Sequence, residues 1–371
     1  MNFFMPVKLF TGAGCIAKEQ ALIYSLGKRC ILVTGQHAAE KSGALKDVTE
    51  LLRLGDIDFF IFNEICQNPT VESCIRAGEA ARKTDADFII GIGGGSAMDA
   101  AKAAAVFAAN PELDEAGFYS GQWQHKPLPV LLVGTTSGTG SEVTKVSVLT
   151  DSRHRKHSIK DDRLFAVASF GDSRYTLELP LPITLSTGVD ILAHCAESYF
   201  SKKADEISRG FAVRGIQLLF DPLLAASEGA ALTPQQREQL YQASIFGGLA
   251  INSTSTCFPH NVGYFLTERH GVPHGFACAT FLPDLLRYEE DFDPAYTEIF
   301  YQEVGLKEDA LLTLIGKCLP KHTFSMTEEE ILQLLPRWEN NGSVNNTRGS
   351  VNTAFILQFL KDKYLRKGET S

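Results

Sequence analysis

Residues 88–107 read FIIGIGGGSAMDAAKAAAVF: a short apolar run, then Gly-Gly-Gly-Ser at 93–96, then a stretch dominated by alanine. The apolar run at 88–92 is short and is followed by glycines, which favours a buried strand. Alanine is the strongest helix former, so the last part predicts a helix that continues through Phe107. A strand, a glycine turn and a helix in this order form one unit of a parallel sheet covered by helices.

The same alternation of strand and helix signals extends to both sides of this stretch. Three further short apolar or β-branched runs predict buried strands at 30–34, 57–62 and 129–133. Strand signals nearly vanish beyond about residue 180, where apolar spacing predicts long helices at 187–200, 206–226, 234–251 and 355–364. The prolines of Pro180-Leu181-Pro182 lie where the strand signals give way to helix signals, so we place a domain boundary at 175–183. An α/β domain followed by an all-α domain leaves a cleft between them, the usual place for a ligand site.

Composition and charge exclude several classes of protein. The chain has 371 residues, of which 44% are hydrophobic and 21% charged, and this suits two globular domains. A net charge of −9 argues against a nucleic-acid partner, and the basic run at 153–156 is typical of a solvated loop. No apolar run approaches the roughly 20 residues that span a bilayer, and the first residues lack the features of a signal peptide. The eight cysteines form no CxxC pair, so we expect a cytoplasmic protein with reduced cysteines.

Two loops rich in glycine and hydroxyl groups follow predicted strands. Glycines at 93–96 let the backbone approach an anion, and the helix behind them presents free N–H groups and a positive dipole end. Asp99 lies one turn into that helix, where its carboxylate either binds a ribose hydroxyl or complements the helix dipole. The second loop, GTTSGTGSE at 134–142, offers hydroxyl and amide donors at the carboxyl end of the strand at 129–133. Parallel sheets bind their ligands at that edge.

The first loop alone is also compatible with a tight structural turn. Two such loops in one domain favour a bound diphosphate over that alternative. Neither loop ends in the Gly-Lys-Ser/Thr of a Walker loop, and neither matches GxGxxG, so both standard nucleotide fingerprints are absent.

Four potential metal ligands follow in the helical half. Asp190 and His194 are four residues apart in a strongly helical stretch, which places both side chains on one face. His260 and His274 come later, the second within Gly-Val-Pro-His-Gly at 271–275. Each residue alone is typical of a surface pair or of an isolated histidine. Together, one carboxylate oxygen and three imidazoles form a set that suits Fe(II) or Zn(II).

These motifs resemble those of the iron-containing (group III) alcohol dehydrogenase family along nearly the whole chain. The motifs are GGGS at 93–96 with Asp99 and Lys102, TTSGTGSEVT at 135–144, Asp190-x3-His194, and His260-x13-His274-Gly275. The resemblance implies a dehydroquinate synthase-like architecture, with an NAD(P)-binding α/β domain at 1–178 and an all-helical metal-binding and substrate domain at 179–371. It also implies that the metal, Fe(II) or Zn(II), is bound by Asp190, His194, His260 and His274.

The resemblance further implies which residues hold the cofactor. They are Gly35, Asn68, Gly94, Gly95, Ser96, Asp99, Thr135, Thr136, Thr139, Thr144 and Lys156. Gly35 stands where many members of the family have an aspartate that binds the adenosine ribose of NAD. Loss of that carboxylate removes repulsion against a 2′-phosphate, which favours NADP(H) over NAD(H). In the alternative interpretation Gly35 is only a turn residue, and the cofactor is NAD. Lys156 matches a lysine that lies near the cofactor in the family. The alternative for Lys156 is a solvated side chain.

Tyr264 stands four residues after His260, where many relatives have a histidine credited with proton relay. A phenol with a pKa near 10 is a poor proton shuttle at neutral pH. His270 is the alternative relay if it lies in the same cleft, and otherwise it is a solvent-facing loop residue. The Tyr264 variant is similar to a branch that includes phosphonoacetaldehyde reductases, which indicates a polar or anionic aldehyde. Arg269 either pairs with such a group or lies on the surface.

The function implied is a metal-dependent, NAD(P)-linked alcohol dehydrogenase or aldehyde reductase. It would exchange a hydride between the nicotinamide and a small, polar or anionic alcohol or aldehyde. A homodimer is expected, with no membrane or nucleic-acid partner. The alternatives are a glycerol-dehydrogenase-like polyol oxidoreductase, a dehydroquinate-synthase-like lyase and a non-catalytic paralogue that binds the cofactor. The Asp/His/His/His set speaks against the first two, and the complete ligand set with both loops speaks against the third.

Overall fold

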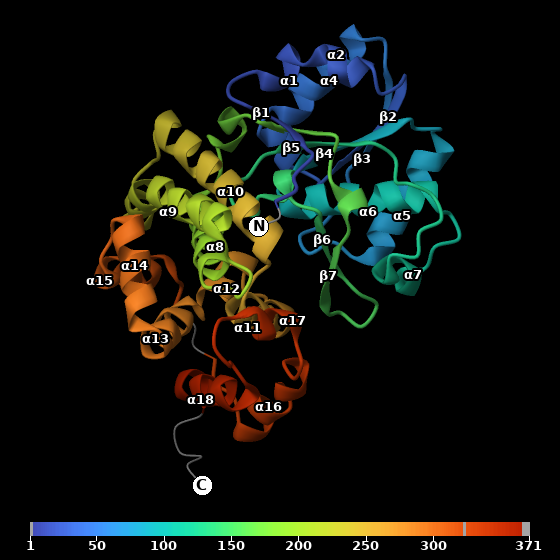
Figure 1. Cartoon of the computed structure of the whole chain (residues 1–371). Helices are drawn as coiled ribbons and strands as arrows, with labels where there is room; N and C mark the ends of the chain where they lie inside the picture. The colour runs from blue at the N-terminus through green and yellow to red at the C-terminus, as the bar shows by residue number, and fades with distance from the viewer. Residues whose placement is uncertain (1–2, 322–323, 366–371) are drawn as a thin grey trace.

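The computed structural model describes residues 3–321 and 324–365. Its amino-terminal half is built on a six-stranded sheet in the order β1-β8-β5-β4-β2-β3, in which every pair is parallel (Figure 1). The strands of this sheet are β1 (Lys8–Thr11), β2 (Arg29–Thr34), β3 (Asp58–Phe62), β4 (Phe88–Gly93), β5 (Val130–Gly134) and β8 (Ala168–Gly171). The helices of this half are α1 (Cys15–Lys18), α2 (Gln20–Tyr24), α3 (Ala38–Lys41), α4 (Ala44–Leu54), α5 (Val71–Lys83), α6 (Gly95–Ala109) and α7 (Glu115–Ser120).

Strand β4, the first part of the stretch that decides the fold, lies between β2 and β5 and is buried along its whole length. Its side chains alternate between the two faces, as a strand requires. Phe88, Ile90 and Ile92 join a core that includes residues of α2 and α4. Ile89 joins the core on the other face, formed with α5 and α6. Burial on both faces explains why this strand is apolar throughout.

The four strands predicted from the sequence correspond to β2, β3, β4 and β5. Two short strands of the sheet, β1 and β8, were not predicted. Strand β8 has the sequence ASFG, whose small residues give little strand signal. A separate antiparallel hairpin, β6 (Val146–Thr150) with β7 (Lys156–Lys160), was also not predicted. It follows the second glycine loop and projects from the sheet (Figure 1).

The carboxyl-terminal half is helical, as the sequence predicts. Its helices are α8 (Leu181–Tyr199), α9 (Glu206–Ser227), α10 (Pro234–Thr254), α11 (Phe258–His270), α12 (His274–Ala279), α13 (Leu282–Phe292), α14 (Pro294–Val304), α15 (Glu308–Cys318), α16 (Glu328–Leu332), α17 (Gly342–Asn346) and α18 (Thr353–Tyr364). Helix α8 begins six residues before the predicted start at 187. Pro182 lies in its first turn, where proline is tolerated because those N–H groups have no partner within the helix.

The two halves are in direct contact beside the second glycine loop. A methyl group on Gly248 of α10 would lie 2.6 Å from the carbonyl oxygen of Gly140, so this approach requires glycine. The Tyr241 hydroxyl of α10 donates to Glu142 Oε1 over 2.7 Å, and both groups are buried. The domain boundary at 178/179 stays a prediction. The last strand of the sheet ends at Gly171, and α8 begins at Leu181.

Every cysteine of the chain lies in the described part and is free, and all are buried except Cys66. Within residues 3–321 and 324–365, no helix is both long and apolar enough to cross a membrane.

Candidate active site

A cavity of about 670 Å³ lies between the glycine loops of the α/β half and the helices of the other half. Of the predicted cofactor residues, nine line it: Asn68, Gly94, Gly95, Ser96, Asp99, Thr136, Thr139, Thr144 and Lys156. All four predicted metal ligands line it as well: Asp190, His194, His260 and His274. Gly35 and Thr135 are not among the lining residues. The structure therefore brings two groups of residues that are far apart in sequence to one cavity.

The two glycine loops contact each other at the wall of this cavity. A methyl group on Gly94 would lie 2.9 Å from Thr136 Oγ1, and one on Gly95 would lie 2.5 Å from Thr139 Cγ2. Gly94 is the residue that precedes α6, and no side chain caps the first N–H groups of this helix. These N–H groups and the threonine hydroxyls thus lie side by side. This is the arrangement that binds phosphate groups at a helix N-terminus.

Two charged residues of α6, the buried Lys102 and the partly buried Asp99, hold the second loop in place. Asp99 accepts hydrogen bonds from Ser141 Oγ at 2.6 Å and from the Val148 amide at 2.9 Å. Lys102 Nζ donates to the carbonyl oxygens of Ser141 at 2.8 Å and of Thr144 at 3.0 Å. The sequence left open whether Asp99 binds ribose or complements the dipole. The observed bonds give it a third role, which is to fix the loop and the β6–β7 hairpin to the helix.

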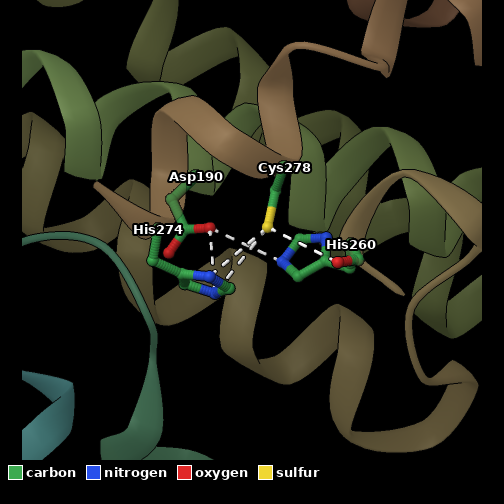
Figure 2. Close-up of side chains that lie close together, drawn as sticks. All are labelled: Asp190, His260, His274 and Cys278. Carbon is green, nitrogen blue, oxygen red and sulfur yellow. Dashed lines mark hydrogen bonds and ion pairs between the residues drawn. The ribbon is translucent and has the colours of Figure 1, made fainter. Parts of the chain in front are cut away.

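The predicted metal ligands converge on one oxygen. Asp190 Oδ1 lies 3.5 Å from His260 Nε2, 3.9 Å from His194 Nε2 and 3.9 Å from His274 Nε2. Helix α8 supplies Asp190 and His194, as their spacing predicts, while α11 and α12 supply the other two histidines. Figure 2 shows Asp190, His260 and His274 pointing toward one another. Ligands about 2.1 Å from a common centre in a tetrahedral arrangement would stand roughly 3.4 Å apart, close to these distances.

Helix α12 lies directly against the backbone of α8. A methyl group on Gly275 would lie 1.8 Å from the carbonyl oxygen of Ser186 and 3.0 Å from Asp190 Cβ. Only glycine permits this contact. The residue before it, His274, is thereby brought to the carboxylate of Asp190.

Glu197 is a part of the site that sequence reasoning missed. It is fully buried, and its Oε1 lies 2.5 Å from His260 Nδ1. Its Oε2 accepts the amide of Cys257 at 2.7 Å, so the carboxylate is held from both sides. With the proton on Nδ1 donated to Glu197, the lone pair of His260 Nε2 faces Asp190. Glu197 stands seven residues after Asp190 and three after His194, a helical spacing that could have revealed it.

Cys278 is a second residue that sequence reasoning missed. Its Sγ lies 3.8 Å from His274 Nε2, and one donor atom from each of Asp190, His260, His274 and Cys278 lies within 4.8 Å of the others (Figure 2). It stands one helical turn after His274, so spacing could have indicated it too. The thiol is buried and is not among the residues that line the cavity.

The charges of the ligands suit a cation. Burial raises the pKa of Asp190, but the facing histidines more than offset this, so its pKa lies well below the usual range and the group is ionised. Burial lowers the pKa of His194 to about 4 despite the attraction of Asp190. Burial and the Lys156 ammonium hold the pKa of His274 well below its ordinary value. The carboxylate and these two neutral imidazoles are in the protonation state that metal binding requires. Burial would lower the pKa of His260 as well, but Cys278, Glu197 and Asp190 outweigh burial and raise this pKa well above its ordinary value, so a metal would displace a proton from this residue.

The residues considered for proton transfer and anion pairing lie in different places. Tyr264 lines the cavity, and Lys156 Nζ lies 5.4 Å from the centre of its ring. His270 does not line it: this residue ends α11, and its ring stacks on Phe324 with centroids 4.0 Å apart. Arg269 is exposed and is also absent from the lining, so the alternative of a surface residue holds for it. Another histidine, His157 of β7, does line the cavity.

Comparison with known proteins identifies the family. The sequence profile described as iron-containing alcohol dehydrogenase matches residues 6–173, and the profile of the carboxyl-terminal part of the same family matches residues 184–335. The chain belongs to the iron-containing alcohol dehydrogenase family. The expectation from the sequence motifs is therefore confirmed, and the chain is an oxidoreductase of the alcohol dehydrogenase class.

Individual members of the iron-containing alcohol dehydrogenase family are similar over most of the chain. The 1,3-propanediol dehydrogenase of Citrobacter freundii is 32% identical over 336 residues, which are 89% of this chain and 84% of that protein. The crystal structure of an iron-containing alcohol dehydrogenase from Thermotoga maritima is 32% identical, with a TM-score of 0.90 over 98% of this chain and 99% of the other. The sulfoacetaldehyde reductase from Bifidobacterium kashiwanohense, solved in complex with NAD⁺, is 27% identical, with a TM-score of 0.87 over 98% of each chain.

Proposed function

We propose that this protein is a metal-dependent, NAD(P)-linked oxidoreductase of small alcohols and aldehydes. In the direction of reduction, a hydride from NAD(P)H adds to the aldehyde carbon and one proton reaches the oxygen, which yields the alcohol and NAD(P)⁺. The observation that carries this proposal is the pair of glycine loops and the Asp190 cluster on the walls of one cavity. Family membership supports it, as does the NAD⁺ complex of the related sulfoacetaldehyde reductase.

A divalent cation fits the residues of the cluster. Asp190 Oδ1 and His260 Nε2 are buried atoms without a hydrogen-bond partner, although they lie 3.5 Å apart. The pKa of His260 is raised well above its ordinary value, so without a metal a proton on Nε2 supplies the positive charge between these two atoms, and a metal ion would take its place. We propose that Asp190, His194, His260 and His274 hold Fe(II) or Zn(II), with Glu197 orienting His260. Such an ion, when bound, supplies Lewis acidity toward the substrate oxygen.

The residues of the α/β half would position the cofactor. The N–H groups at the start of α6, with Thr136 and Thr139, would bind the pyrophosphate. The Lys156 ammonium is close enough to the Asp190 cluster to act on the pKa of His274, and Lys156 with Thr144 would contact the nicotinamide half. The walls from both halves of the chain would exclude water around the reacting carbon. Asn68 lies beside the first loop, since its amide is 3.3 Å from Ser96 Oγ, and would contact the same end of the cofactor.

NADP(H) is the cofactor that Gly35 favours. It follows the last residue of β2, at the carboxyl edge of the sheet, and presents no carboxylate to a 2′-phosphate. The test is Gly35→Asp, which should shift the ratio of kcat/KM for NADPH to that for NADH toward NADH by at least about tenfold. An unchanged ratio would show that Gly35 is only a turn residue.

Tyr264 would act as a hydrogen-bond donor in the cavity. Burial raises the pKa of its phenol, so the group keeps its proton at neutral pH and does not shuttle it. His157 lines the cavity with its side chain 46% exposed, and it would pass a proton to water. His270, the relay predicted from the sequence, lies outside the cavity lining and would need another route. Substitution of each histidine by Gln separates the two, because only the true relay should alter the pH profile of kcat.

The experiment that tests the function is a panel of small aldehydes with NADH and NADPH, after anaerobic reconstitution with Fe(II) or Zn(II). Reduction that depends on the metal is expected. Absence of turnover with any aldehyde despite one bound metal per chain would favour the non-catalytic paralogue. Preference for a polyol such as glycerol would favour the polyol oxidoreductase. The homodimer stays a prediction, which light scattering in solution would check.

A further inference from the structure

We propose that one end of the cavity is an anion subsite formed by Lys160, Ser255 and Thr256. The substrate class would then be small aldehydes and alcohols that carry a sulfonate, phosphonate or carboxylate group. This inference rests on the proposed function and adds the substrate class to it. It differs from the expectation that Arg269 binds the anion, because Arg269 is absent from the cavity lining.

Strand β7 directs two cations into the cavity. Its residues alternate in direction, so Lys156, Ser158 and Lys160 share one face. All three line the cavity. No described carboxylate oxygen lies within 4.0 Å of either ammonium, whereas the nearby Lys145 is paired with Asp162 at 2.6 Å. Asp161, the neighbour of Lys160 in sequence, is paired with Arg163 at 2.7 Å. Lys160 is thus an ammonium group without a carboxylate partner among the described residues, because Asp161 and Asp162 are paired with other cations.

Ser255 is held against this ammonium in an unusual backbone conformation. Lys160 Nζ donates to Ser255 Oγ over 2.5 Å. Ser255 has φ of +66°, a region that residues other than glycine rarely adopt, and such strain is often found at ligand sites. Thr256 follows and also lines the cavity. The same short segment leads into α11, whose third residue is His260, so the subsite and the metal ligands are on one continuous wall.

The register of the hairpin separates this subsite from the phosphate loops. Lys156 is opposite Thr150, whose hydroxyl donates to the Asn68 carbonyl at 3.2 Å, so this end of β7 adjoins the first loop. Lys160 is opposite Val146, at the other end of the hairpin. Four strand residues span about 13 Å, which exceeds the reach of one phosphate group. The two lysines therefore cannot bind one and the same phosphate group.

The carboxylates near Lys160 in sequence are already paired. Lys160 is exposed on the whole, but desolvation of its ammonium lowers the pKa to about 8, and the ammonium groups of Lys203 and Lys145 add to the shift. Asp161 and Asp162 are paired with Arg163 and Lys145, so Lys160 and Lys203 leave an excess of positive charge at this end of the cavity. An anionic head group would supply the missing counter-charge and accept hydrogen bonds from Lys160 and from the two hydroxyl groups.

The experiment compares matched aldehydes with the metal-reconstituted enzyme. The anionic set is sulfoacetaldehyde, phosphonoacetaldehyde and succinic semialdehyde, and the neutral reference is propanal. For the wild type we expect kcat/KM to favour at least one anion by tenfold or more, and the three arms show which anion fits. Lys160→Met should lower the ratio of anionic to neutral kcat/KM by roughly 10- to 100-fold, mainly through KM. Lys160→Arg should recover part of it.

The matched control is Lys126→Met, because this exposed cation does not line the cavity and is not among the charges that act on Lys160. It should leave the ratio within about twofold, since a distant charge in solvent is screened. Equal loss in Lys126→Met, or an unchanged ratio in Lys160→Met, would overturn the subsite. Turnover of propanal but of no anionic aldehyde would overturn it while the proposed function stands.

A direct binding measurement keeps the subsite testable if no aldehyde is reduced. Titration calorimetry of the wild type with the alcohols 2-hydroxyethanesulfonate and 2-hydroxyethylphosphonate should show binding that Lys160→Met weakens by tenfold or more, with 1-propanol as the neutral probe. Such binding without any turnover would contradict the proposed function alone. No binding of either anion would overturn the subsite.

Discussion

The α/β half and the helical half of this protein build their parts of the cavity in opposite ways. The α/β half uses backbone groups and small hydroxyl side chains from two loops, each contiguous in the sequence. The helical half uses ionisable side chains from α8, α11 and α12, which are separated by more than 60 residues of chain between His194 and His260. One half therefore depends on close backbone approach and the other on donor atoms, and substitutions should damage them independently.

The largest effect is expected for His260→Ala in the helical half. Loss of one donor of the cluster should remove the bound metal and lower turnover by roughly 1,000-fold or more, since metal catalysis supplies several kcal/mol. Metal analysis and aldehyde reduction measure this. The dissociation constant for NADPH should change by no more than about threefold, because distant sites are largely independent. His37→Ala, at an exposed histidine, is the control. A variant that kept metal and turnover would refute the ligand assignment.

Glu197→Gln tests how the helical half orients its donors. The amide oxygen of Gln is an uncharged and weaker acceptor for the His260 Nδ1 proton, so metal affinity should fall about 10- to 100-fold. Competition with a chelator of known affinity measures the metal affinity of each variant. Cofactor affinity should not change. Glu228→Gln, at an exposed ion pair with Lys317, provides the comparison. Equal metal affinity in the two variants would mean that Glu197 is only a packing residue.

Gly95→Ala is the corresponding test of the α/β half. The added methyl group would lie 2.5 Å from Thr139 Cγ2, so the two loops must separate. Overpacking of about 1–3 kcal/mol should weaken dinucleotide binding by roughly 5- to 100-fold. Fluorescence titration with NADPH measures it, and metal content should stay at the wild-type level. Gly210→Ala, where nothing lies within 4 Å of the added carbon, is the control. Loss of metal in Gly95→Ala would contradict the independence of the two halves.

The smallest effect concerns the pH dependence of stability, in which the halves should differ in sign. Burial raises the pKa of Glu289 in α13 to about 7, although Arg348 opposes the shift. A carboxyl group with a raised folded pKa loses stabilisation as pH rises from about 4.5 to 7. Relative to Glu289→Gln, the free energy of unfolding of the wild type should fall by about 2 kcal/mol between pH 5 and pH 8. Urea unfolding at both pH values measures this.

Asp172 in the α/β half is the counterpart with the opposite sign. Burial alone would raise its pKa, but hydrogen bonds from Arg174 and the Gly14 amide lower it overall. Its contribution is present above the unfolded pKa and is lost as pH falls through the folded value. Asp172→Asn should therefore destabilise the protein at pH 7 and approach the wild type in acid. The same direction of change in both variants would refute this contrast.

The sequence predicted best what is local. Residues 88–107 predicted a strand, a loop and a helix because the apolar run, the glycines and the alanines each influence the backbone conformation only within a few residues. The spacing of Asp190 and His194 placed both on one helix face. His260 and His274 were matched by family pattern, and helix periodicity did not predict α11 or α12, which carry them.

Features that depend on packing between distant segments were not predictable in the same way. The hydrogen bond of Lys160 to Ser255 joins residues that are 95 positions apart, and no short-range pattern in the sequence predicts it. The role of Lys102 depends on carbonyl groups of the second loop. His270 shows the same limit, because it was a candidate from the sequence and only the fold shows that His157, which the sequence analysis did not consider, lines the cavity instead.

The contact of Gly275 with the Ser186 carbonyl also bears on how such a protein can diverge. Peptide groups do not shrink or rotate away as side chains do, so the spacing of α8 and α12 leaves no room for gradual adjustment. The wall with Lys160 and Ser255 consists of side chains whose length and charge can change one at a time. Descendants of this chain could thus acquire new substrates by altering that wall, while the distance from His274 to Asp190 is inherited unchanged.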